Sequence, residues 1–266
     1  MENLQNLHTH STFSDGANTP EEMLLTAIEK GFTSIGFSDH SETAYVGSLK
    51  SGEPTLKYMQ EIRRLKEKYR GEISVYCGLE FDSCSKVDIS GYDYIIGSVH
   101  YINGVTMDRD ADYVRNLIDT HYAGDSMKYV KAYYEELATL HHYEHVDIIG
   151  HFDLLTKHKE NVTFFDEESK LYKKYAIEAA EALSGKIPFF EVNTGAIARG
   201  YRTTPYPSIF LIKELKRLGF GVVITSDCHN REKLDCGFCD ATELLKSCGY
   251  KEKYILTDNG FVPVSL

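Results

Sequence analysis

The sequence has no continuous apolar run of about 18 residues or more, the length that a membrane-spanning helix needs. It also has no basic N-terminal head followed by an apolar stretch, because His8 and His10 fall where that stretch would lie. We therefore expect a protein that neither crosses a membrane nor is exported, and that acts in the cytoplasm.

The sequence has fewer basic than acidic residues. Of 266 residues, 29 are Lys or Arg and 40 are Asp or Glu, which gives a formal net charge of −11. Binding to the backbone of DNA or RNA needs clustered basic side chains, so a nucleic-acid polymer is not an expected partner. A small anionic substrate remains compatible with this charge, because bound divalent cations can reverse the local charge of a site.

The cysteine spacing of a structural zinc site is also missing. Among six cysteines, Cys236 and Cys239 form a lone C-x-x-C, with no second pair and no suitable Cys/His pair nearby. We expect ordinary reduced thiols. The chain likewise shows no linker, low-complexity tract or internal repeat, so residues 1–266 are expected to form one domain.

What the chain does contain is an alternation of short β-like runs and amphipathic helices, which is typical of a parallel sheet with crossover helices. Thr19, Pro20, Glu21 and Glu22, for example, form a helix start, and Gly31 ends that helix. A single TIM-like α/β barrel is the economical interpretation, and a doubly wound open sheet is the alternative. Strands are expected at 4–8, 33–37, 73–79, 94–99, 146–149, 188–192 and 221–225, with a last extended piece at 254–256. Helices are expected at 20–30, 54–69, 127–143, 167–183, 209–218 and 241–248, with a polar excursion at 101–125.

Histidines and carboxylates stand at the C-terminal ends of the predicted strands. In a barrel these ends converge on one face, and residues two apart on a strand point to the same side. His8 and His10 can therefore point together, whereas only one of Asp39 and His40 can point inward, and we expect His40. Imidazole suits zinc, iron and similar metals, and carboxylates can bridge two cations. The other strand-end groups are Glu80, His100, His151, Glu191, Asn193, Asp227 and His229.

The short motifs around these residues resemble those of a known family. They are HTHSTFSDG at 8–16, GFSDH at 36–40, GLE at 78–80, GSVH at 97–100, GHFD at 150–153 and TSDCH at 225–229. In this order they are similar to the motifs of the PHP phosphoesterases, named after polymerase and histidinol phosphatase. The chain length and the segment EVNTGAIARGYRTTPYP at 191–207 look most like the histidinol phosphatase branch.

The resemblance implies a distorted (β/α)₇ barrel that binds three divalent transition-metal ions, drawn from zinc, manganese and iron. Glu80 would be the bridging carboxylate. Asp15 lies in the loop after the first strand, and only the family motif identifies it as a ligand. The implied sets are His8, His10, Glu80 and Asp227 for one metal, Glu80, His100 and His151 for a second, and Asp15, His40 and His229 for a third.

The resemblance also implies hydrolysis of a small phosphate monoester, most specifically of L-histidinol phosphate to L-histidinol and phosphate in histidine biosynthesis. A hydroxide shared by the metals would attack phosphorus, since bound metals lower the pKa of water. Glu80, Asp227 and His229 are the expected catalytic groups. The residue that protonates the leaving group is left open.

Arg199 and Arg202 follow the sixth predicted strand on the active-site side. A guanidinium matches phosphate geometry, so at least one of them is expected to bind it. Asn193 is expected to contact the substrate or to orient a ligand. Further candidates to orient ligands are Asp153 and Glu191, and candidates to receive the substrate's ammonium group are Glu42 and Asp108.

Three other functions compete with this one. A PHP phosphodiesterase acting on small nucleotides has the same ligand set. A non-catalytic PHP module would bind metal without turnover. An amidohydrolase uses a similar barrel, but such enzymes usually carry a metal-bridging lysine, which is absent from the corresponding strand ends here. The identity of the native metals and the oligomeric state are left open.

Overall fold

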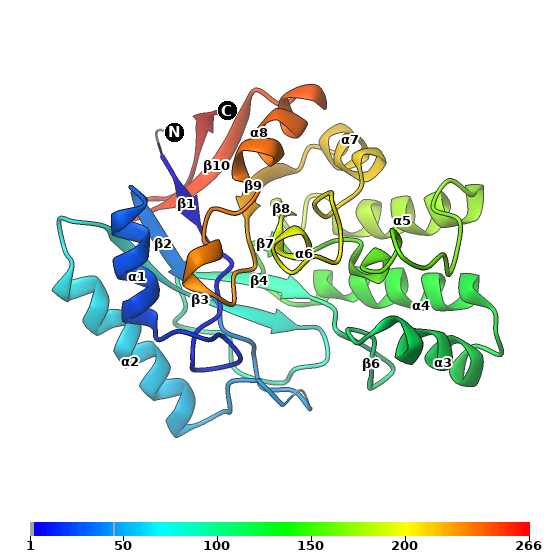
Figure 1. Ribbon diagram of the computed structural model, residues 1–266, viewed down its shortest axis with the longest axis horizontal. Coiled ribbons are helices and arrows are strands. Elements are labelled where there is room, and N and C mark those ends of the chain that lie inside the picture. Colours follow the sequence, from blue (N-terminus) through cyan, green and yellow to red (C-terminus); the bar gives the residue numbers. More distant parts are fainter. Residues whose placement is uncertain (1–2, 45) are drawn as a thin grey trace.

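The computed structural model describes residues 3–44 and 46–266. Its main sheet has seven strands, all parallel to their neighbours, in the order β1-β2-β3-β4-β7-β8-β9 (Figure 1). The two edges meet where Thr9 bridges Cys228, because the Cys228 N–H donates to the His8 carbonyl at 3.1 Å. The strands are β1 Gln5–Asn6, β2 Ser34–Phe37, β3 Ser74–Asp82, β4 Tyr94–Ser98, β7 Ile148–Ile149, β8 Phe189–Asn193 and β9 Gly221–Thr225. The predicted barrel is confirmed, and the alternative of a doubly wound sheet is wrong, because a nearly closed sheet in chain order has no switch point.

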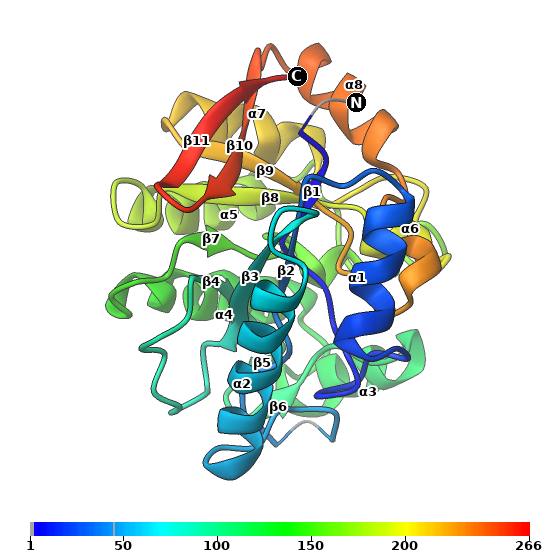
Figure 2. The same cartoon turned by 90° about the vertical axis from the view of Figure 1, so that its left-hand side faces the viewer.

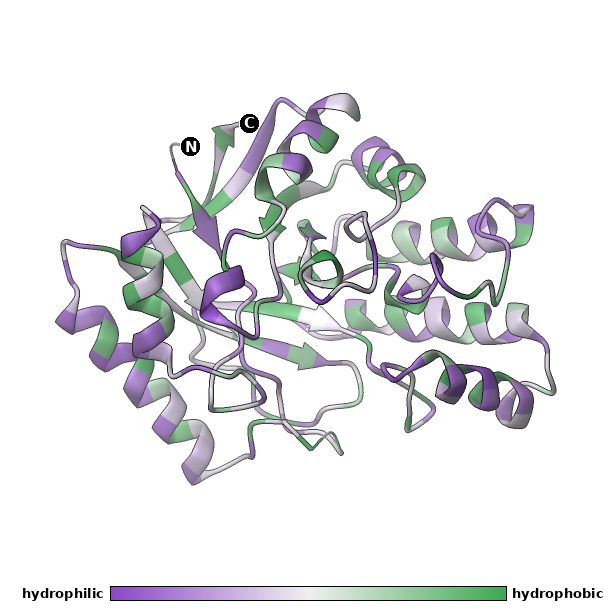
Figure 3. Cartoon of the chain, in the orientation of Figure 1, coloured by the Kyte–Doolittle hydropathy of each residue, from purple (hydrophilic) through white to green (hydrophobic). Residues whose placement is uncertain are grey.

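Helices surround this barrel (Figures 1 and 2). The predicted start of the first helix is a capping box, in which Thr19 and Glu22 each accept a hydrogen bond from the other's N–H. On α2, Tyr58, Ile62 and Leu65 are buried at helical spacing, while the outward face is hydrophilic (Figure 3). The helices are α1 Pro20–Glu29, α2 Glu53–Lys68, α3 Ala111–His121, α4 Ser126–Ala138, α5 Lys170–Leu183, α6 Gly195–Ala198, α7 Ile209–Arg217 and α8 Phe238–Ser247, with 3₁₀ turns at Thr139–His142, Leu154–Thr156 and Arg231–Lys233. No helix within residues 3–44 and 46–266 has the length and apolar character to span a membrane.

The polar excursion expected at 101–125 is an ordered insertion between β4 and α4. It contains the antiparallel pair β5 (Tyr101–Ile102) and β6 (Val105–Thr106), followed by α3. Asp110 caps α3 by accepting a hydrogen bond from the Tyr113 N–H, and the helix buries Val114, Leu117 and Ile118. The spacing of these three apolar residues is the signal for a helix, although the polar residues around them obscure it.

The last extended piece is one arm of a hairpin outside the barrel sheet. Strand β10 (Glu252–Thr257) pairs antiparallel with β11 (Gly260–Ser265). Gln5 ties this hairpin to β1, because its side chain donates to the Leu256 carbonyl and accepts from the Leu256 N–H. The hairpin therefore covers the N-terminal ends of the strands, opposite the face that carries the polar strand ends (Figure 2).

A tyrosine side chain fills the barrel interior between the hairpin and the polar face. The Tyr94 hydroxyl donates to the Leu7 carbonyl across the barrel. A Cβ atom added at Gly36 or at Gly78 would lie 2.4 or 2.2 Å from the Tyr94 side chain. Glycine at these two positions therefore makes the room that Tyr94 occupies.

The cysteines are free thiols, as expected. Cys77, Cys228 and Cys248 are buried, whereas Cys84 and Cys239 are exposed. Cys239 lies in the first turn of α8 rather than in the loop before a helix.

Candidate metal centre

The predicted ligands come together at the C-terminal ends of the strands. His8 and His10, just beyond β1, are fully buried with ring centroids 5.1 Å apart. His40 faces the same centre, whereas the adjacent Asp39 turns away and accepts hydrogen bonds from the Ser11 N–H and hydroxyl. Asp39 therefore fixes the loop after β1, and His40 is the member of the pair that reaches the centre.

Glu80 lies in the middle of this cluster. It belongs to β3 rather than to the loop beyond it, and it is 1% exposed. Its Oε2 atom lies 2.7 Å from His40 Nδ1 and 3.4 Å from His8 Nε2. The further contacts are His10 Nε2 at 3.5 Å from Oε2, and His151 Nε2 at 3.0 Å and His100 Nε2 at 3.6 Å from Oε1. One carboxylate thus contacts histidines contributed by four different strand ends.

Three groups of side chains could each hold a cation. Within each group, the candidate ligand atoms lie within 4.8 Å of one another. His10 and His40 each belong to two of these groups, whereas in the sets that the family resemblance implies only Glu80 is shared. His151 belongs to none of the three groups, but its Nε2 atom lies 3.0 Å from Glu80 Oε1. The groups are His10, Asp15, His40 and His229; His8, His10 and Asp227; and His40, Glu80 and His100.

The centre is chemically suited to divalent cations. His8 Nε2 and His10 Nε2 are buried beside carboxylates and form no hydrogen bond within the described chain. Leaving buried polar atoms unpaired costs about 1–3 kcal/mol each, and more for charged groups. Imidazole nitrogens beside carboxylate oxygens are the donor set of zinc, iron and manganese. These unpaired atoms therefore fit metal ligands.

The electrostatics differ among these groups. Burial lowers the pKa of His8, His40 and His100, but neighbouring carboxylates outweigh burial and raise it, so a metal must displace protons from these three rings. Glu80 and His10 are already in the states that a metal requires. Burial raises the pKa of the Glu80 carboxyl, but His40, His8 and His100 outweigh it and hold the pKa well below its usual range. Burial, together with His229 and His40, lowers the pKa of His10 to about 3. An ionised Glu80 and a neutral His10 both present lone pairs to a cation.

Two buried carboxylates, those of Glu191 and Asp82, contact the Nδ1 atoms of His8 and His100 and orient these rings. Glu191 Oε2 lies 2.9 Å from His8 Nδ1, and Glu191 Oε1 accepts a hydrogen bond from the backbone N–H of His151 at 2.7 Å. Asp82 Oδ2 lies 3.0 Å from His100 Nδ1. Such contacts fix the ring and leave Nε2 facing the metal. Asp82 was not predicted as a site residue, although it lies two residues from Glu80 on β3, a spacing that indicates a shared face.

Replacing Glu191 by Gln should lower metal affinity about 10- to 100-fold, because a partner that orients a ligand is lost while volume is kept. The measurement is metal affinity by competition with a chelating dye. Asp153→Asn is the matched control, since Asp153 accepts the Ser208 N–H rather than a histidine. Equal affinity in Glu191→Gln and the wild type would show that Glu191 does not orient the ligands.

The centre opens into a hollow of about 280 Å³. Three cationic side chains, those of Arg109, Lys157 and Arg199, line it. Arg199 donates to Asp227 Oδ2 at 2.9 Å and to the Asp227 carbonyl at 3.0 Å, and its side chain is 33% exposed. The remaining lining residues are Asp15, His40, His100, Asp108, Asp110, His151, Leu154, Tyr201, Asp227 and His229.

Two candidates for substrate contact, Arg202 and Asn193, are not among the residues that line the hollow, and Asn193 has the position expected of a group that orients a ligand. Arg202 is 3% exposed, and its guanidinium donates to the Thr156 and Thr204 hydroxyls, a placement that does not fit a phosphate contact. Asn193 is buried and donates to Glu191 Oε1, so it supports a ligand-orienting carboxylate instead of reaching the hollow. Strand order alone could not distinguish these positions, because the path of the loop after β8 decides them.

Between the two ammonium candidates, Asp108 lines the hollow. Glu42 accepts the Ser51 N–H at 2.9 Å, within its own loop. Lys157 and Tyr201, which were not predicted as site residues, also line the hollow. Their positions in the sequence could have identified them. Lys157 follows the GHFD motif in the loop after β7, and Tyr201 lies between Arg199 and Arg202.

Comparisons with known proteins identify the fold and the relatives of this chain. The probable histidinol-phosphatase of Schizosaccharomyces pombe is 25% identical over 255 residues, 86% of this chain and 81% of that protein. The histidinol-phosphatase of Lactococcus lactis is 24% identical, over 92% of this chain and 91% of its own. A solved structure of histidinol phosphate phosphatase from L. lactis, complexed with zinc, L-histidinol and phosphate, has the same fold, with a TM-score of 0.73 at 20% identity over 98% of this chain and 99% of that chain.

A family model described as the PHP domain matches residues 6–195. The matched region contains seven of the expected ligands, from His8 to His151, whereas Asp227 and His229 lie beyond it. Because the match extends over more than half of the chain, this protein belongs to the PHP domain family.

Proposed function

We propose that this metal-dependent PHP phosphoesterase hydrolyses L-histidinol phosphate to L-histidinol and phosphate. The observation that carries the proposal is the Glu80-centred cluster of histidines and carboxylates, which opens directly into a hollow lined by three cationic side chains. A phosphate monoester needs both features, because its charge and its attacking nucleophile must be accommodated together. The histidinol-phosphatases that resemble this chain over most of its length support the choice of substrate.

The residues assigned to metal binding are the full predicted set, and the proposed occupants are three divalent ions, zinc, manganese or iron. Such ions supply Lewis-acid stabilisation of phosphate charge and make water nucleophilic near neutral pH. The ligands are His8, His10, Asp15, His40, Glu80, His100, His151, Asp227 and His229.

Asp227 acts in this scheme as a ligand and not as a proton donor. Burial raises the pKa of its carboxyl, but Arg199 and His8 outweigh burial and hold the pKa well below its usual range. The group is therefore ionised throughout the physiological range. His229 lies 3.3 Å from Asp15 through Nε2, which places it at the mouth of the same centre.

The test of the function is steady-state phosphate release by the metal-loaded protein. Histidinol phosphate should be turned over with a higher kcat/KM than p-nitrophenyl phosphate, AMP and bis-p-nitrophenyl phosphate. A preference for the diester or for the nucleotide would overturn the proposal and favour the phosphodiesterase alternative.

Replacing Arg199 by Ala should raise KM for the phosphorylated substrate and lower kcat/KM by about 10- to 100-fold, the value of a charge-assisted hydrogen bond. Because Arg199 also bonds Asp227, the assay should use saturating metal, with metal content measured alongside. Arg217→Ala, on the outward face of α7, is the matched control. Unchanged kinetics in Arg199→Ala would remove Arg199 from phosphate binding.

A further inference from the structure

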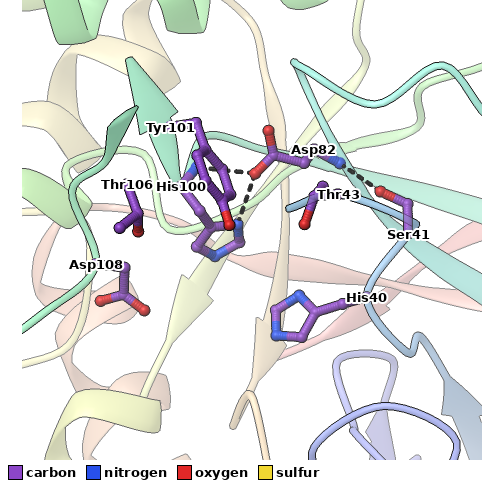
Figure 4. A pocket seen from close by; sticks show the side chains of 8 residues that line it. All are labelled: His40, Ser41, Thr43, Asp82, His100, Tyr101, Thr106 and Asp108. Atoms are coloured by element: carbon purple, nitrogen blue, oxygen red, sulfur yellow. Dashed lines mark hydrogen bonds and ion pairs between the residues drawn. The ribbon is translucent and has the colours of Figure 1, made fainter. Parts of the chain in front are cut away.

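A small recess opens from the side of the hollow. Its volume is about 20 Å³, and it shares His40, His100 and Asp108 with the hollow. Figure 4 shows Asp108 across this recess from His40, with His100 and Tyr101 above. The other residues that line it are Ser41, Thr43, Asp82 and Thr106. The recess thus adjoins the metal centre, and the carboxylate of Asp108 is among the groups that line it.

Asp108 is distinguished from the other carboxylates that line the hollow. Asp15 and Asp227 belong to the candidate cation groups. Asp110 caps α3 by accepting the Tyr113 N–H through Oδ1 at 2.9 Å, and it lines the hollow but not the recess. Asp108 is the remaining carboxylate, and it lines both the hollow and the recess.

One oxygen of Asp108 is fixed, and the other is available to a ligand. Lys157 Nζ donates to Asp108 Oδ1 at 2.6 Å, and the two side chains are 14% and 28% exposed respectively. Lys157 also lies over the Tyr201 ring, 4.4 Å from its centroid, which holds the ammonium in place. Asp108 Oδ2 has no hydrogen-bond partner among residues 3–44 and 46–266.

The charge around Asp108 keeps it anionic. Burial raises the pKa of its carboxyl, but Lys157, His100 and Arg199 outweigh burial and bring the pKa below its ordinary value. The site therefore presents a carboxylate close to cationic groups that line the same hollow. This pairing is complementary to a ligand that carries its own cation close to a phosphate.

We propose that Asp108 receives the ammonium group of a β-aminoalkyl phosphate, a monoester whose amine and ester oxygen stand on neighbouring carbons, and so determines substrate specificity. The proposal deepens the proposed function and rests on it, because it assumes that phosphate lies at the Glu80-centred cluster. Asp108 Oδ2 takes the ammonium at the recess, while Lys157 holds the carboxylate in position. Histidinol phosphate belongs to this chemical class, and so do simpler amino-alcohol phosphates.

The test is a binding measurement that does not require turnover. Aminopropylphosphonate and butylphosphonate are non-hydrolysable and nearly isosteric, and they differ in the presence of an ammonium group. Titration calorimetry on the metal-loaded wild type should show the amino ligand binding about 10- to 100-fold more tightly, as expected for a hydrogen bond between charged groups. In Asp108→Asn this preference should disappear, with the dissociation constant of butylphosphonate unchanged.

Asp110→Asn is the matched control, because its carboxylate lines the same hollow but caps α3. It should keep the preference. Equal affinity of the wild type for the two ligands, absence of binding of either, or a preference retained in Asp108→Asn would each overturn the proposal. Failure of the proposed function has a separate readout, since it concerns phosphate release and leaves this comparison of affinities intact.

Discussion

Glu80→Gln is expected to lower kcat/KM for phosphate monoesters by ~10³-fold or more, because metals supply several kcal/mol of transition-state stabilisation and each ~1.4 kcal/mol is a factor of ten. The side chain keeps its volume but loses the charge that faces several histidines. The measurement is phosphate release together with metal content by atomic emission, and both should fall.

The size of this effect follows from the position of Glu80. Its two oxygens contact different histidines, with His40 at 2.7 Å on one side and His151 at 3.0 Å on the other. Losing one such ligand affects more than one cation, whereas losing a peripheral ligand affects one. Glu80 belongs to one candidate cation group and contacts His8, His10 and His40 of the other two, so the three groups should empty together.

A matched control is Glu243→Gln on α8, whose carboxylate is 73% exposed and pairs with Lys246. It should retain metal and turnover, because an exposed ion pair of this kind contributes little. Full activity with full metal content in Glu80→Gln would show that Glu80 does not bridge the cations.

The barrel and the location of its polar face could be predicted from the sequence because both depend on local patterns. Strand-length apolar runs alternate with amphipathic helices, and each run ends in a histidine or carboxylate. Parallel strands then force those ends onto one face. Asp15 was different: it lies in a loop, so its place beside His229 follows from the family motif and not from strand geometry.

The surroundings of the centre could not be predicted in the same way. Arg199 and Arg202 have the same residue type and nearly the same position, yet one faces the hollow and the other is buried against Thr156. That difference arises from how the chain turns after β8. Likewise, Asp108 reaches the recess because β5 and β6 fold the 101–125 segment back towards His100, a tertiary arrangement that its polar sequence obscures.

The second large effect is expected on stability. Removing divalent cations with a chelator should lower the melting temperature Tm by about 8–16 °C, reversibly. A ligand present at about 1,000 times its Kd stabilises a fold by ~4 kcal/mol, and each kcal/mol shifts Tm by about 2–4 °C in a chain near this size. The physical cause is that His8 Nε2 and His10 Nε2 are buried and form no hydrogen bond in the described chain, so removal of the cations leaves them unpaired.

Far-UV circular dichroism suits this measurement, because the chain has no tryptophan to report unfolding by fluorescence. Adding back zinc, manganese or iron(II) in excess should restore Tm, and the ion that restores it most at equal free concentration is the one the site binds best. Glu80→Gln provides the internal control. Because this variant already lacks the central carboxylate, chelation should lower its Tm much less than that of the wild type. An unchanged wild-type Tm after complete removal of metal would mean that the cluster is stable through its own hydrogen bonds and ion pairs, and would contradict the assignment of its unpaired nitrogens as metal ligands.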